Sequence, residues 1–580
     1  MKPPAPCPPE VVRTSKLEAT YRGANAPALR GLSLDARRGE LILVMGASGA
    51  GKSTLIKCLS RIVPSFEAAA LRGEIALFGE AAGELTVRDL AGRVGVIFQD
   101  FEAQLFSTNV LCEVAFAMEQ LGTPAAEMPA RADAALAAVG LDGLADRDPA
   151  TLSGGEKQRL AIAGLLALHP CILLLDEPTT DLDPVGKADV LGLLDGLKRQ
   201  GRTVIVVEHE IGVAAVADRI LLLRDGEAVA CATPAELLPQ VGLFEECGVR
   251  PHDIARLLNL LETRGSGWRD WLGELHRGRA HEAAHRMLVA AGFAATGGAD
   301  PEVDDVPSRP LGLVRLTVRA ASFEYSNGER ALDDISLIMR AGEFVAIIGQ
   351  NGSGKTTLAK HLNGLLIPTR GSVQLDGVEL RGIAHHRIAS EVGFVFQDPD
   401  HQLFAATVAE EVAFGPANLG LLEAEVEERT REALEAVGLW HHRDADPFLL
   451  DKGERQRLAV ASVLSLRPSV LILDEPTTGL DYREQRAMME LLRGLNEGGT
   501  TVVIVTHSTW VVAEYASRAI LMADGRILWD GPLRRLFEKP DLLARAAFRV
   551  PEITALGQRF GVTVLSVEEL ARRLGTKRGT

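Results

Sequence analysis

Two glycine-rich loops of one type constrain this chain most, residues 46–54 (GASGAGKST) and residues 349–357 (GQNGSGKTT). Each follows a short apolar run and precedes helix-forming residues, which is the order strand, phosphate loop, helix. Backbone N–H groups in such a loop bind a polyphosphate, the lysine reaches its terminal phosphates, and Ser53 or Thr356 offers a hydroxyl to Mg²⁺. The expected nucleotide contacts are Gly46, Ser48, Gly49, Gly51, Lys52, Ser53 and Thr54, and in the second loop Gly349, Asn351, Gly352, Gly354, Lys355, Thr356 and Thr357.

The chain is a tandem repeat of one nucleotide-binding module. Lys355 follows Lys52 by 303 residues, whereas Glu475 follows Glu177 by 298. The first half therefore carries five additional residues, and the spacing places them near residues 61–71. Insertions between motifs are well tolerated, so both halves are predicted to share an α/β fold in which helices cover a sheet.

Charge and hydropathy limit the partners of the chain. Its 580 residues include 62 Lys and Arg against 78 Asp and Glu, a formal net charge of −16. A protein that neutralises nucleic-acid phosphates carries the opposite charge, so we expect no nucleic-acid partner. No run approaches the roughly 18 to 20 apolar residues of a membrane span, so we expect the chain itself not to cross a membrane.

Acidic residues end two further apolar runs. Each run is followed by Asp-Glu-Pro-Thr-Thr, with Asp176 and Glu177 in the first half and Asp474 and Glu475 in the second. The first carboxylate of each pair is placed to hold Mg²⁺ through water, and the second to polarise an attacking water. One such run alone would more readily be a solvated strand end, but its repetition at 298 residues favours the catalytic interpretation.

A histidine follows the next apolar run in each half, at His209 and His507. An imidazole there could contact a γ-phosphate and orient the attacking water. A lone histidine at a strand end is more often structural, but the shared interval of 298 residues favours the catalytic role.

These motifs, together with LSGGEKQR at residues 152–159, resemble those of ATP-binding cassette (ABC) ATPases in both halves. The resemblance implies hydrolysis of ATP with Mg²⁺, coupled to transmembrane transport. It also implies that each half has a RecA-like α/β core, an antiparallel β subdomain, a helical signature subdomain and a small C-terminal appendage. The predicted boundaries are residues 1–263 for the first cassette and its appendage, 264–310 for a linker, 311–545 for the second cassette, and 546–580 for its appendage.

In that family two cassettes pack head to tail, so each ATP lies between the phosphate loop of one and the signature of the other. Tyr21 and Tyr325 are placed to stack on adenine, although an aromatic residue ahead of the loop could equally pack in the core. The remaining nucleotide contacts implied by the resemblance are Ser153, Gly154, Gly155, Asp451 and Gly453 in the signatures, and Asp183 and Asp481 in the D-loops.

The second signature departs from the family pattern. It reads LDKGERQR, with Asp451 and Lys452 in place of a serine and a glycine. Head-to-tail pairing would put this carboxylate opposite Lys52, where it would repel a γ-phosphate while Lys452 offset part of its charge. We therefore predict unequal ATP sites, with faster hydrolysis where Lys355 pairs with Ser153. Harmless sequence drift is the alternative, because both catalytic glutamates remain.

The segments at residues 98–122 and 396–420 (FQDPDHQLF at the start of the second) indicate a subfamily. They resemble energy-coupling factor (ECF) transporter ATPases, whose QLF segment forms an extra helix lining the groove for a transmembrane partner. The resemblance implies that Gln99 and Gln397 sense the γ-phosphate and contact Mg²⁺. The alternative is that the QLF residues pack inside the helical subdomain. The residues expected on the extra helix are Gln104, Leu105, Phe106, Gln402, Leu403 and Phe404.

The ECF resemblance implies two membrane partners, a coupling protein of the ECF-T type and a substrate-capture protein of the S component type. This chain would supply both ATPases, peripheral at the cytoplasmic face of the cell membrane, for uptake of a vitamin or transition-metal ion. Two other classes remain open: a fused ATPase of a conventional sugar or peptide importer, and a soluble tandem ABC protein acting on ribosomes or DNA. The QLF segments argue against the first, and the charge of −16 against the second.

Overall fold

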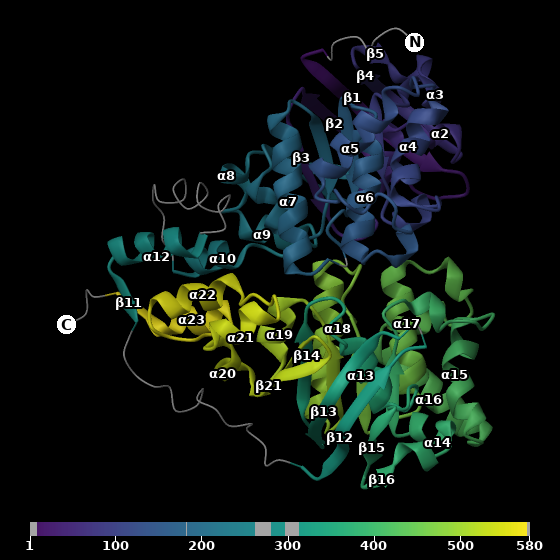
Figure 1. Cartoon of the computed structure of the whole chain (residues 1–580), viewed down its shortest axis with the longest axis vertical. Coiled ribbons are helices and arrows are strands. Elements are labelled where there is room, and N and C mark those ends of the chain that lie inside the picture. The colour runs from purple at the N-terminus through teal and green to yellow at the C-terminus, as the bar shows by residue number, and fades with distance from the viewer. Residues whose placement is uncertain (1–7, 181, 262–279, 296–311, 327, 577–580) are drawn as a thin grey trace. The chain divides into compact units, whose positions relative to one another are not determined.

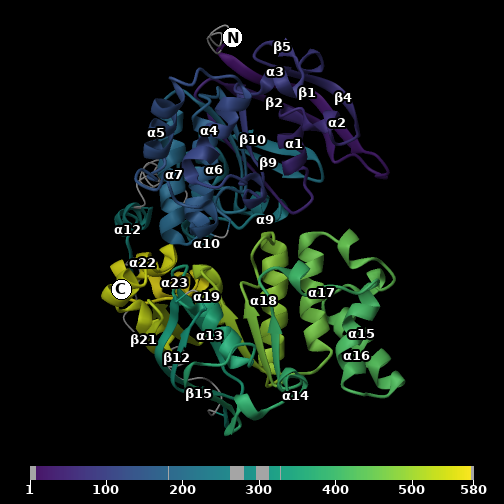
Figure 2. The same cartoon turned by 45° about the vertical axis from the view of Figure 1, so that its right-hand side comes forward.

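The computed structural model describes residues 8–180, 182–261, 280–295, 312–326 and 328–576. The chain divides into two compact units, Met1–Ala280 and His281–Thr580, which Figures 1 and 2 show from two directions. Each unit contains a six-stranded and a four-stranded sheet with helices packed against them. Among the described residues, no helix is both long and apolar enough to span a bilayer.

The first unit is built on a six-stranded sheet in the order β10-β9-β3-β8-β7-β6. Neighbouring strands are parallel except β10, which is antiparallel to β9. Every residue of β3, β7 and β8 is buried, as expected for parallel strands covered on both faces. The strands are β3 (Leu41–Gly46), β6 (Val94–Ile97), β7 (Ile172–Asp176), β8 (Thr203–Val207), β9 (Arg219–Arg224) and β10 (Glu227–Ala232).

The rest of the first unit is an antiparallel sheet of order β2-β1-β4-β5 and a set of helices. Its strands are β1 (Glu10–Tyr21), β2 (Leu29–Arg37), β4 (Ala69–Leu77) and β5 (Glu80–Ala81). Helices α4, α5 and α6 pack together as the helical subdomain. The helices are α1 (Lys52–Leu59), α2 (Ile62–Ser65), α3 (Val87–Leu90), α4 (Val110–Gln120), α5 (Met128–Ala138), α6 (Gly154–Leu166), α7 (Pro184–Arg199), α8 (Pro234–Leu237), α9 (Val241–Glu246) and α10 (Asp253–Leu260).

The second unit repeats this architecture with sheet orders β17-β18-β19-β14-β20-β21 and β13-β12-β15-β16. Its strands are β12 (Val314–Glu324), β13 (Arg330–Arg340), β14 (Phe344–Gly349), β15 (Arg370–Leu375), β16 (Val378–Glu379), β17 (Val392–Val395), β18 (Val470–Asp474), β19 (Thr501–Val505), β20 (Arg518–Ala523) and β21 (Arg526–Pro532). Its helices are α13 (Lys355–Leu362), α14 (His385–Ala389), α15 (Val408–Asn418), α16 (Glu423–Ala436), α17 (Lys452–Leu464), α18 (Tyr482–Glu497), α19 (Thr509–Tyr515), α20 (Leu533–Phe537), α21 (Pro540–Arg545), α22 (Glu552–Arg559) and α23 (Val567–Arg573). The predicted fold class, two tandem α/β cassettes, is confirmed.

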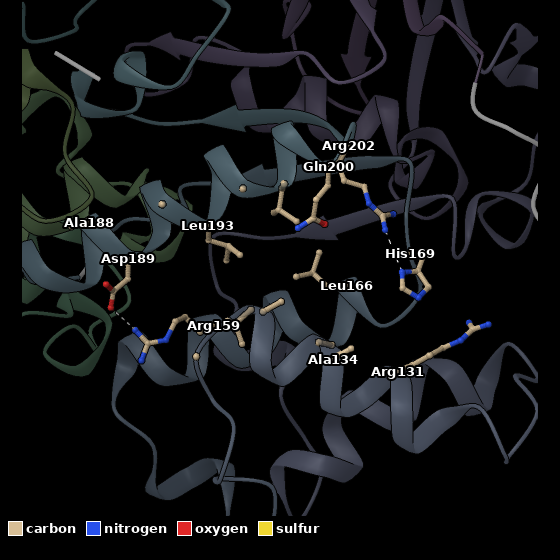
Figure 3. A pocket seen from close by; sticks show the side chains of 17 residues that line it. Arg131, Ala134, Arg159, Leu166, His169, Ala188, Asp189, Leu193, Gln200 and Arg202 are labelled. Carbon is tan, nitrogen blue, oxygen red and sulfur yellow. Dashed lines mark hydrogen bonds and ion pairs between the residues drawn. The ribbon is translucent and has the colours of Figure 1, made fainter. Parts of the chain in front are cut away.

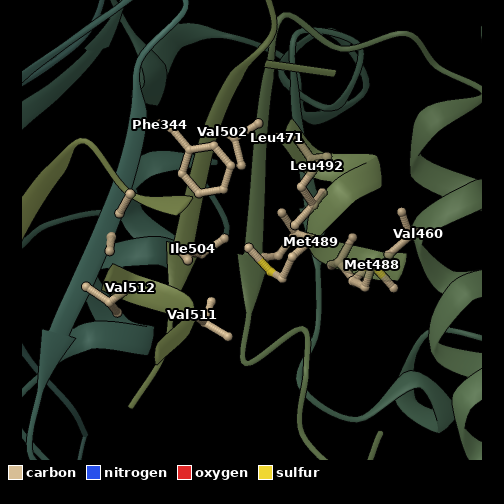
Figure 4. Close-up of a cluster of buried hydrophobic side chains, with 14 of the residues drawn as sticks. Phe344, Val460, Leu471, Met488, Met489, Leu492, Val502, Ile504, Val511 and Val512 are labelled. Carbon is tan, nitrogen blue, oxygen red and sulfur yellow. The ribbon is translucent and has the colours of Figure 1, made fainter. Parts of the chain in front are cut away.

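The core of the second unit explains how the strand ends that carry the predicted catalytic residues are held. Met488, Met489 and Leu492 on one face of α18 pack against the central sheet, where Val502 and Ile504 of β19 belong to the same buried cluster (Figure 4). A second cluster packs the opposite face of the sheet against α13. Burial on both faces fixes the strands, so the residues that follow them emerge at defined positions.

The five additional residues of the first half fall between the end of α1 and the end of β4. This segment forms the one-turn helix α2, and β4 has nine residues where the matching β15 has six. The insertion therefore extends the antiparallel sheet and leaves the six-stranded sheet unchanged in its strand order.

Part of the predicted linker is folded. Helix α12 (Ala280–Ala290) precedes β11 (Phe293–Ala295), which pairs antiparallel with β22 (Leu574–Thr576) near the end of the chain. An ion pair joins Glu282 to Arg559 of α22. Residues 281–295 thus belong to the second unit, whereas residues 264–279 and 296–310 of the predicted linker lie outside the described residues.

Candidate active sites

The two phosphate loops have the same construction. Each connects a central strand to a helix whose N-cap glycine has positive φ, +94° at Gly51 and +95° at Gly354. A Cβ on Gly51 would lie 2.4 Å from the carbonyl oxygen of Ala28, so only glycine fits there. Lys52 Nζ donates to the carbonyl oxygen of Gly46 at 2.9 Å, and Lys355 Nζ donates to that of Gly349 at 3.0 Å. The lysines therefore lie folded over their loops, where a terminal phosphate would replace these contacts.

Both candidate adenine-stacking tyrosines lie beside a phosphate loop. Tyr21 Oη donates to Thr54 Oγ1 at 3.4 Å, and Tyr325 Oη lies 3.0 Å from Thr357 Oγ1. Tyr325 is 36% exposed, whereas Tyr21 packs partly against the core of its unit. The position favours a nucleotide contact, and stacking on adenine stays a prediction.

A pair of buried carboxylates fits a divalent cation. Asp176 and Asp474 end β7 and β18, where each hydrogen-bonds a phosphate-loop hydroxyl, that of Ser53 or Thr356. Burial raises the pKa of each aspartate to about 6. In both, Oδ1 is buried and has no hydrogen-bond partner among the residues that the structure describes, and an uncompensated carboxylate oxygen beside a hydroxyl suits Mg²⁺.

The cation would be held by few protein groups. Within the described part of the chain, no cluster of three or more His, Cys, Asp or Glu could hold a metal ion. Mg²⁺ commonly keeps several waters and binds through one or two protein oxygens plus the substrate phosphates. The aspartate and hydroxyl of each cassette fit that coordination.

The candidate catalytic glutamates contact the candidate histidines. Glu177 Oε1 lies 2.8 Å from His209 Nε2, and Glu475 Oε1 lies 2.8 Å from His507 Nδ1. Burial alone would raise the pKa of Glu177, but the hydrogen bond and charge of His209, with the charge of Lys52, lower it to about 2. Burial is likewise outweighed at Glu475, whose pKa is lowered by His507. Both glutamates are thus ionised at neutral pH.

The glutamates also carry backbone strain. Glu177 has a φ of +53° and Glu475 a φ of +49°, in the left-handed region that side chains rarely adopt. Such strain costs about 1–3 kcal/mol and persists where the surrounding structure enforces it, commonly at functional sites. In each cassette the predicted D-loop follows a few residues after the glutamate. Its aspartate, Asp183 or Asp481, is the N-cap of α7 or α18.

The degenerate second signature keeps its fold. Ser153 is the N-cap of α6 and forms a capping box with Glu156. Asp451 is the N-cap of α17 and forms the same box with Glu454, whose backbone N–H it accepts at 2.7 Å. Asp and Ser are equally good caps, so this substitution changes the charge at the helix start without removing the cap.

Other signature positions differ in their steric demands. A Cβ on Gly453 would lie 2.2 Å from Oε1 of Glu484, whereas a Cβ on Gly154 meets nothing within 4 Å. A Cβ on Gly479 would lie 2.9 Å from Lys452 Nζ, so that lysine lies against the D-loop of its own cassette. Gly155, which matches Gly453, faces Leu182 at 3.5 Å.

The prediction that the QLF residues lie on an extra helix is wrong. Only single turns form, η2 (Glu102–Gln104) and η6 (Pro399–His401), and of the six residues expected on the helix only Gln104 lies in one. The reason is a buried carboxylate. Glu113 accepts the backbone N–H groups of Phe106 and the next residue at 3.0 and 2.7 Å, so these groups do not bond to helix carbonyls.

The alternative of internal packing holds for part of each QLF segment. Gln402 donates to the carbonyl oxygen of Ala459 and to Ser462 Oγ, both at 2.9 Å, and Leu403 is buried. Gln104 accepts the backbone N–H of Phe98 at 3.2 Å. The two phenylalanines are instead exposed.

Sequence reasoning missed an ion pair that repeats between the halves. Lys157 of α6 lies 2.9 Å from Glu102 of η2, and Arg455 of α17 lies 2.7 Å from Asp400 of η6. Both cations and both anions are separated by 298 residues, so the conserved sign at matching repeat positions was the available signal. The pair connects the QLF segment to the signature helix in each cassette.

A cavity of about 710 Å³ in the first unit lies apart from these residues. It opens between α5, α6 and α7, with Arg131, His169 and Arg202 near one end and Leu166 and Leu193 along its walls (Figure 3). No predicted nucleotide contact lines it.

Comparisons with known proteins agree with this geometry. A family model described as ABC transporter matches residues 29–180 and 332–478, and a model described as an AAA domain matches residues 447–513. An ABC transporter ATP-binding protein, so described, of Caldanaerobacter subterraneus subsp. tengcongensis is 45% identical over 94% of this chain and 95% of its own. One of Methanosarcina acetivorans is 39% identical over 93% of this chain and 89% of its own.

Among solved structures, cbiO1 of Clostridium perfringens, part of the transporter complex cbiONQ, is 35% identical and covers 42% of this chain and 99% of its own, with a TM-score of 0.37. The ABC transporter model spans just over half of the 580 residues, in two segments that each contain a phosphate loop and an Asp-Glu pair. The chain belongs to the ABC transporter family, as an ATP-binding protein with two ATPase cassettes that hydrolyse ATP with Mg²⁺.

Proposed function

We propose that this chain is the energy-coupling ATPase of an ECF-type importer, with both cassettes in one polypeptide. It would drive uptake of a vitamin or transition-metal ion through an ECF-T type coupling protein and an S component, from the cytoplasmic face of the cell membrane. The observation that carries the proposal is a pair of exposed phenylalanines that occurs at the same place in each cassette. The domain boundaries predicted above form part of the proposal, except that residues 281–295 belong to the second unit and not to the linker.

The exposed phenylalanines form a small apolar surface in each cassette. Phe106 is 62% exposed and packs edge-on against Phe116 of α4, with ring centroids 4.5 Å apart. Phe404 is 59% exposed and packs in the same way on Phe414 of α15, at 4.7 Å. Large exposed aromatic pairs mark interaction surfaces, and a repeated pair suits a partner that contacts both cassettes.

A buried glutamate holds the loop backbone beside each aromatic pair. Glu411 is 3% exposed and accepts the backbone N–H groups of Phe404 and Ala405 at 2.9 and 2.8 Å, as Glu113 does in the first cassette. A buried carboxylate needs such donors, so the loop backbone is held in one conformation. Fixed aromatic side chains favour a docking surface over a loose loop.

The repeated ion pairs offer a route from the docking surface to the ATP site. Lys157 and Arg455 lie on the helices that begin at the signatures, and their partners lie within four residues of Phe106 and Phe404. A displacement of the QLF segment by a membrane partner would therefore pull on the signature helix. This contiguous contact is a physical basis for coupling hydrolysis to transport.

In each site the side chains and loop backbone would bind the ATP phosphates and orient the attacking water. Lysine and the loop N–H groups would bind the ATP phosphates, while the signature of the other cassette would close the site. Glu177 and Glu475, with pKa values held low, would orient the attacking water as hydrogen-bond acceptors, with His209 and His507 fixing the carboxylates. Bound Mg²⁺ would neutralise phosphate charge. The phosphoryl group passes to water, so no covalent enzyme intermediate forms.

The experiment that tests the proposal is affinity purification of the tagged chain from detergent-solubilised host membranes, followed by mass spectrometry. We expect a coupling protein together with a small, very apolar capture protein. The variant Phe106→Ala/Phe404→Ala should lose both, whereas Leu422→Ala, which removes another exposed apolar side chain, should retain them. Recovery of two conventional permease subunits with a separate binding protein, or of ribosomes, would contradict the proposal.

A further inference from the structure

The residue before each catalytic histidine differs between the cassettes. Glu208 precedes His209, and Thr506 stands 298 residues later before His507. Thr506 Oγ1 donates to Oε2 of Glu475 at 3.2 Å. Glu208 is 2% exposed and makes no such bond; its Oε1 accepts the backbone N–H and the hydroxyl of Thr179, both at 2.7 Å.

This exchange changes what the first catalytic glutamate contacts. Oε2 of Glu177 accepts from Gln99 Nε2 at 3.0 Å and from Thr180 Oγ1 at 3.2 Å. In the second cassette Oε2 of Glu475 accepts from Thr506, and no hydrogen bond between described residues joins Gln397 to Glu475. The glutamine expected to meet the γ-phosphate is thus bound to the base in one cassette only.

The charge of Glu208 is also restricted by its surroundings. Burial raises the pKa of Glu208 to about 8. The hydrogen bonds from Thr179 lower this pKa by less than burial raises it, and the nearby carboxylates of Glu177 and Glu210 raise it further. A protonated Glu208 still accepts from Thr179 through Oε1, so the tie to the turn after Glu177 persists in the neutral form.

We propose that Glu208 is a positioning residue that slows the first ATP site, because it ties the turn at Thr179 and leaves Oε2 of Glu177 to Gln99. The proposal rests on the roles given above to Glu177 and Gln99. Before catalysis the Gln99 amide must leave Glu177, so that the amide can meet the nucleotide and the carboxylate can accept from water. The second site needs no such exchange.

The slower hydrolysis proposed here for the first ATP site arises from Glu208 and not from the altered second signature. Under head-to-tail pairing, the phosphate loop of the first cassette meets Asp451, so Glu208 and Asp451 would act on the same site. Substitutions at Glu208 leave both signatures intact, and their effect on turnover therefore reports on the surroundings of Glu177, through Thr179 and Gln99, and not on the altered signature.

The test measures kcat and KM for ATP in chains with one working base. In a Glu475→Gln chain, Glu208→Thr should raise kcat roughly threefold to tenfold with KM changed less than twofold, because one hydrogen bond to a carboxylate no longer has to break. Glu208→Gln keeps the side-chain length and an oxygen that can accept from Thr179, so its kcat should match that of the Glu475→Gln chain. In a Glu177→Gln chain, Thr506→Glu should lower kcat by a similar factor.

Several results would overturn the proposal. One is an unchanged or lower kcat in a folded Glu208→Thr chain. Another is an equal rise in kcat from Glu208→Gln, which would assign the slow turnover to the charge of Glu208. If Glu208→Thr does not fold, Thr506→Glu decides, and an unchanged kcat there refutes the idea. Wild-type turnover by a Glu177→Gln/Glu475→Gln chain would instead refute the roles of the glutamates, whatever Glu208 does.

Discussion

Replacing Asp176 by asparagine should stabilise the nucleotide-free protein while abolishing hydrolysis at that site. The carboxylate is buried, Oδ1 lacks a partner, and the pKa is raised from 3.8 to about 6, with burial as the largest cause. Asparagine has nearly the same shape and no charge, and its amide can still pair with the hydroxyl of Ser53. The buried carboxylate is therefore expected to destabilise the folded protein until a cation binds.

The magnitude follows from the pKa shift. A rise of about two units corresponds to about 3 kcal/mol against the ionised form in the folded state. Because the folded pKa lies above the unfolded one, the wild-type protein bears no penalty well below pH 4 and the full penalty above about pH 6. The gain from Asp176→Asn should therefore be complete at pH 8 and reduced to about half at pH 5.

Calorimetry of the nucleotide-free chain in EDTA at pH 8 and pH 5 measures this gain. For a cassette of this size, about 3 kcal/mol corresponds to a rise of about 5–10 °C in its transition. Asp474→Asn, with the same raised pKa, is an internal replicate in the other cassette. Glu177→Gln is the opposite control, because the lowered pKa of Glu177 predicts a loss of stability. A less stable Asp176→Asn chain, or an equal gain at both pH values, would show that the Asp176 carboxylate does not carry this penalty.

Three further predictions test the contacts around the sites. Glu102→Lys should uncouple ATP turnover from substrate uptake in the assembled transporter, and adding Lys157→Glu should restore coupling at least half-way, since the pair is only reversed; failure of the double variant would show that the pair is passive. Asp451→Ser should raise the turnover of the Glu475→Gln chain roughly threefold or more by removing a carboxylate near the γ-phosphate, and an unchanged rate would identify harmless drift. Gly51→Ala should abolish nucleotide binding in the first cassette and cost about 1–3 kcal/mol of stability, because the backbone at residue 51 has a positive φ. Gly154→Ala is the control, because a Cβ there meets open space, and it should leave the melting temperature within about 1 °C of wild type.

The repeat made much of this molecule predictable from sequence. The phosphate loops, the Asp-Glu pairs and the histidines each occur at matching positions, and the parallel strands that carry them are continuous apolar runs. In the structure Glu177 contacts His209, and Glu475 contacts His507, whereas the sequence predicted only that each histidine meets a γ-phosphate.

The sequence was less informative where a side chain takes over a backbone role. The QLF segments do not form the expected helix, because buried Glu113 and Glu411 accept the backbone N–H groups that a helix would use. The sequence indicated only that Asp451 adds a negative charge to the second signature, whereas the structure shows that it is the N-cap of α17. The contact of Glu208 with Thr179 depends on the reach of one side chain, which no sequence pattern specifies.

ATP hydrolysis by the purified chain, measured with and without its co-purified membrane partners in liposomes, shows whether those partners control the two ATPase cassettes. We expect the wild-type chain to hydrolyse ATP faster when the membrane partners are present, and Glu177→Gln/Glu475→Gln to be inactive in both conditions. Equal rates with and without the partners, or turnover by the double variant, would contradict this expectation.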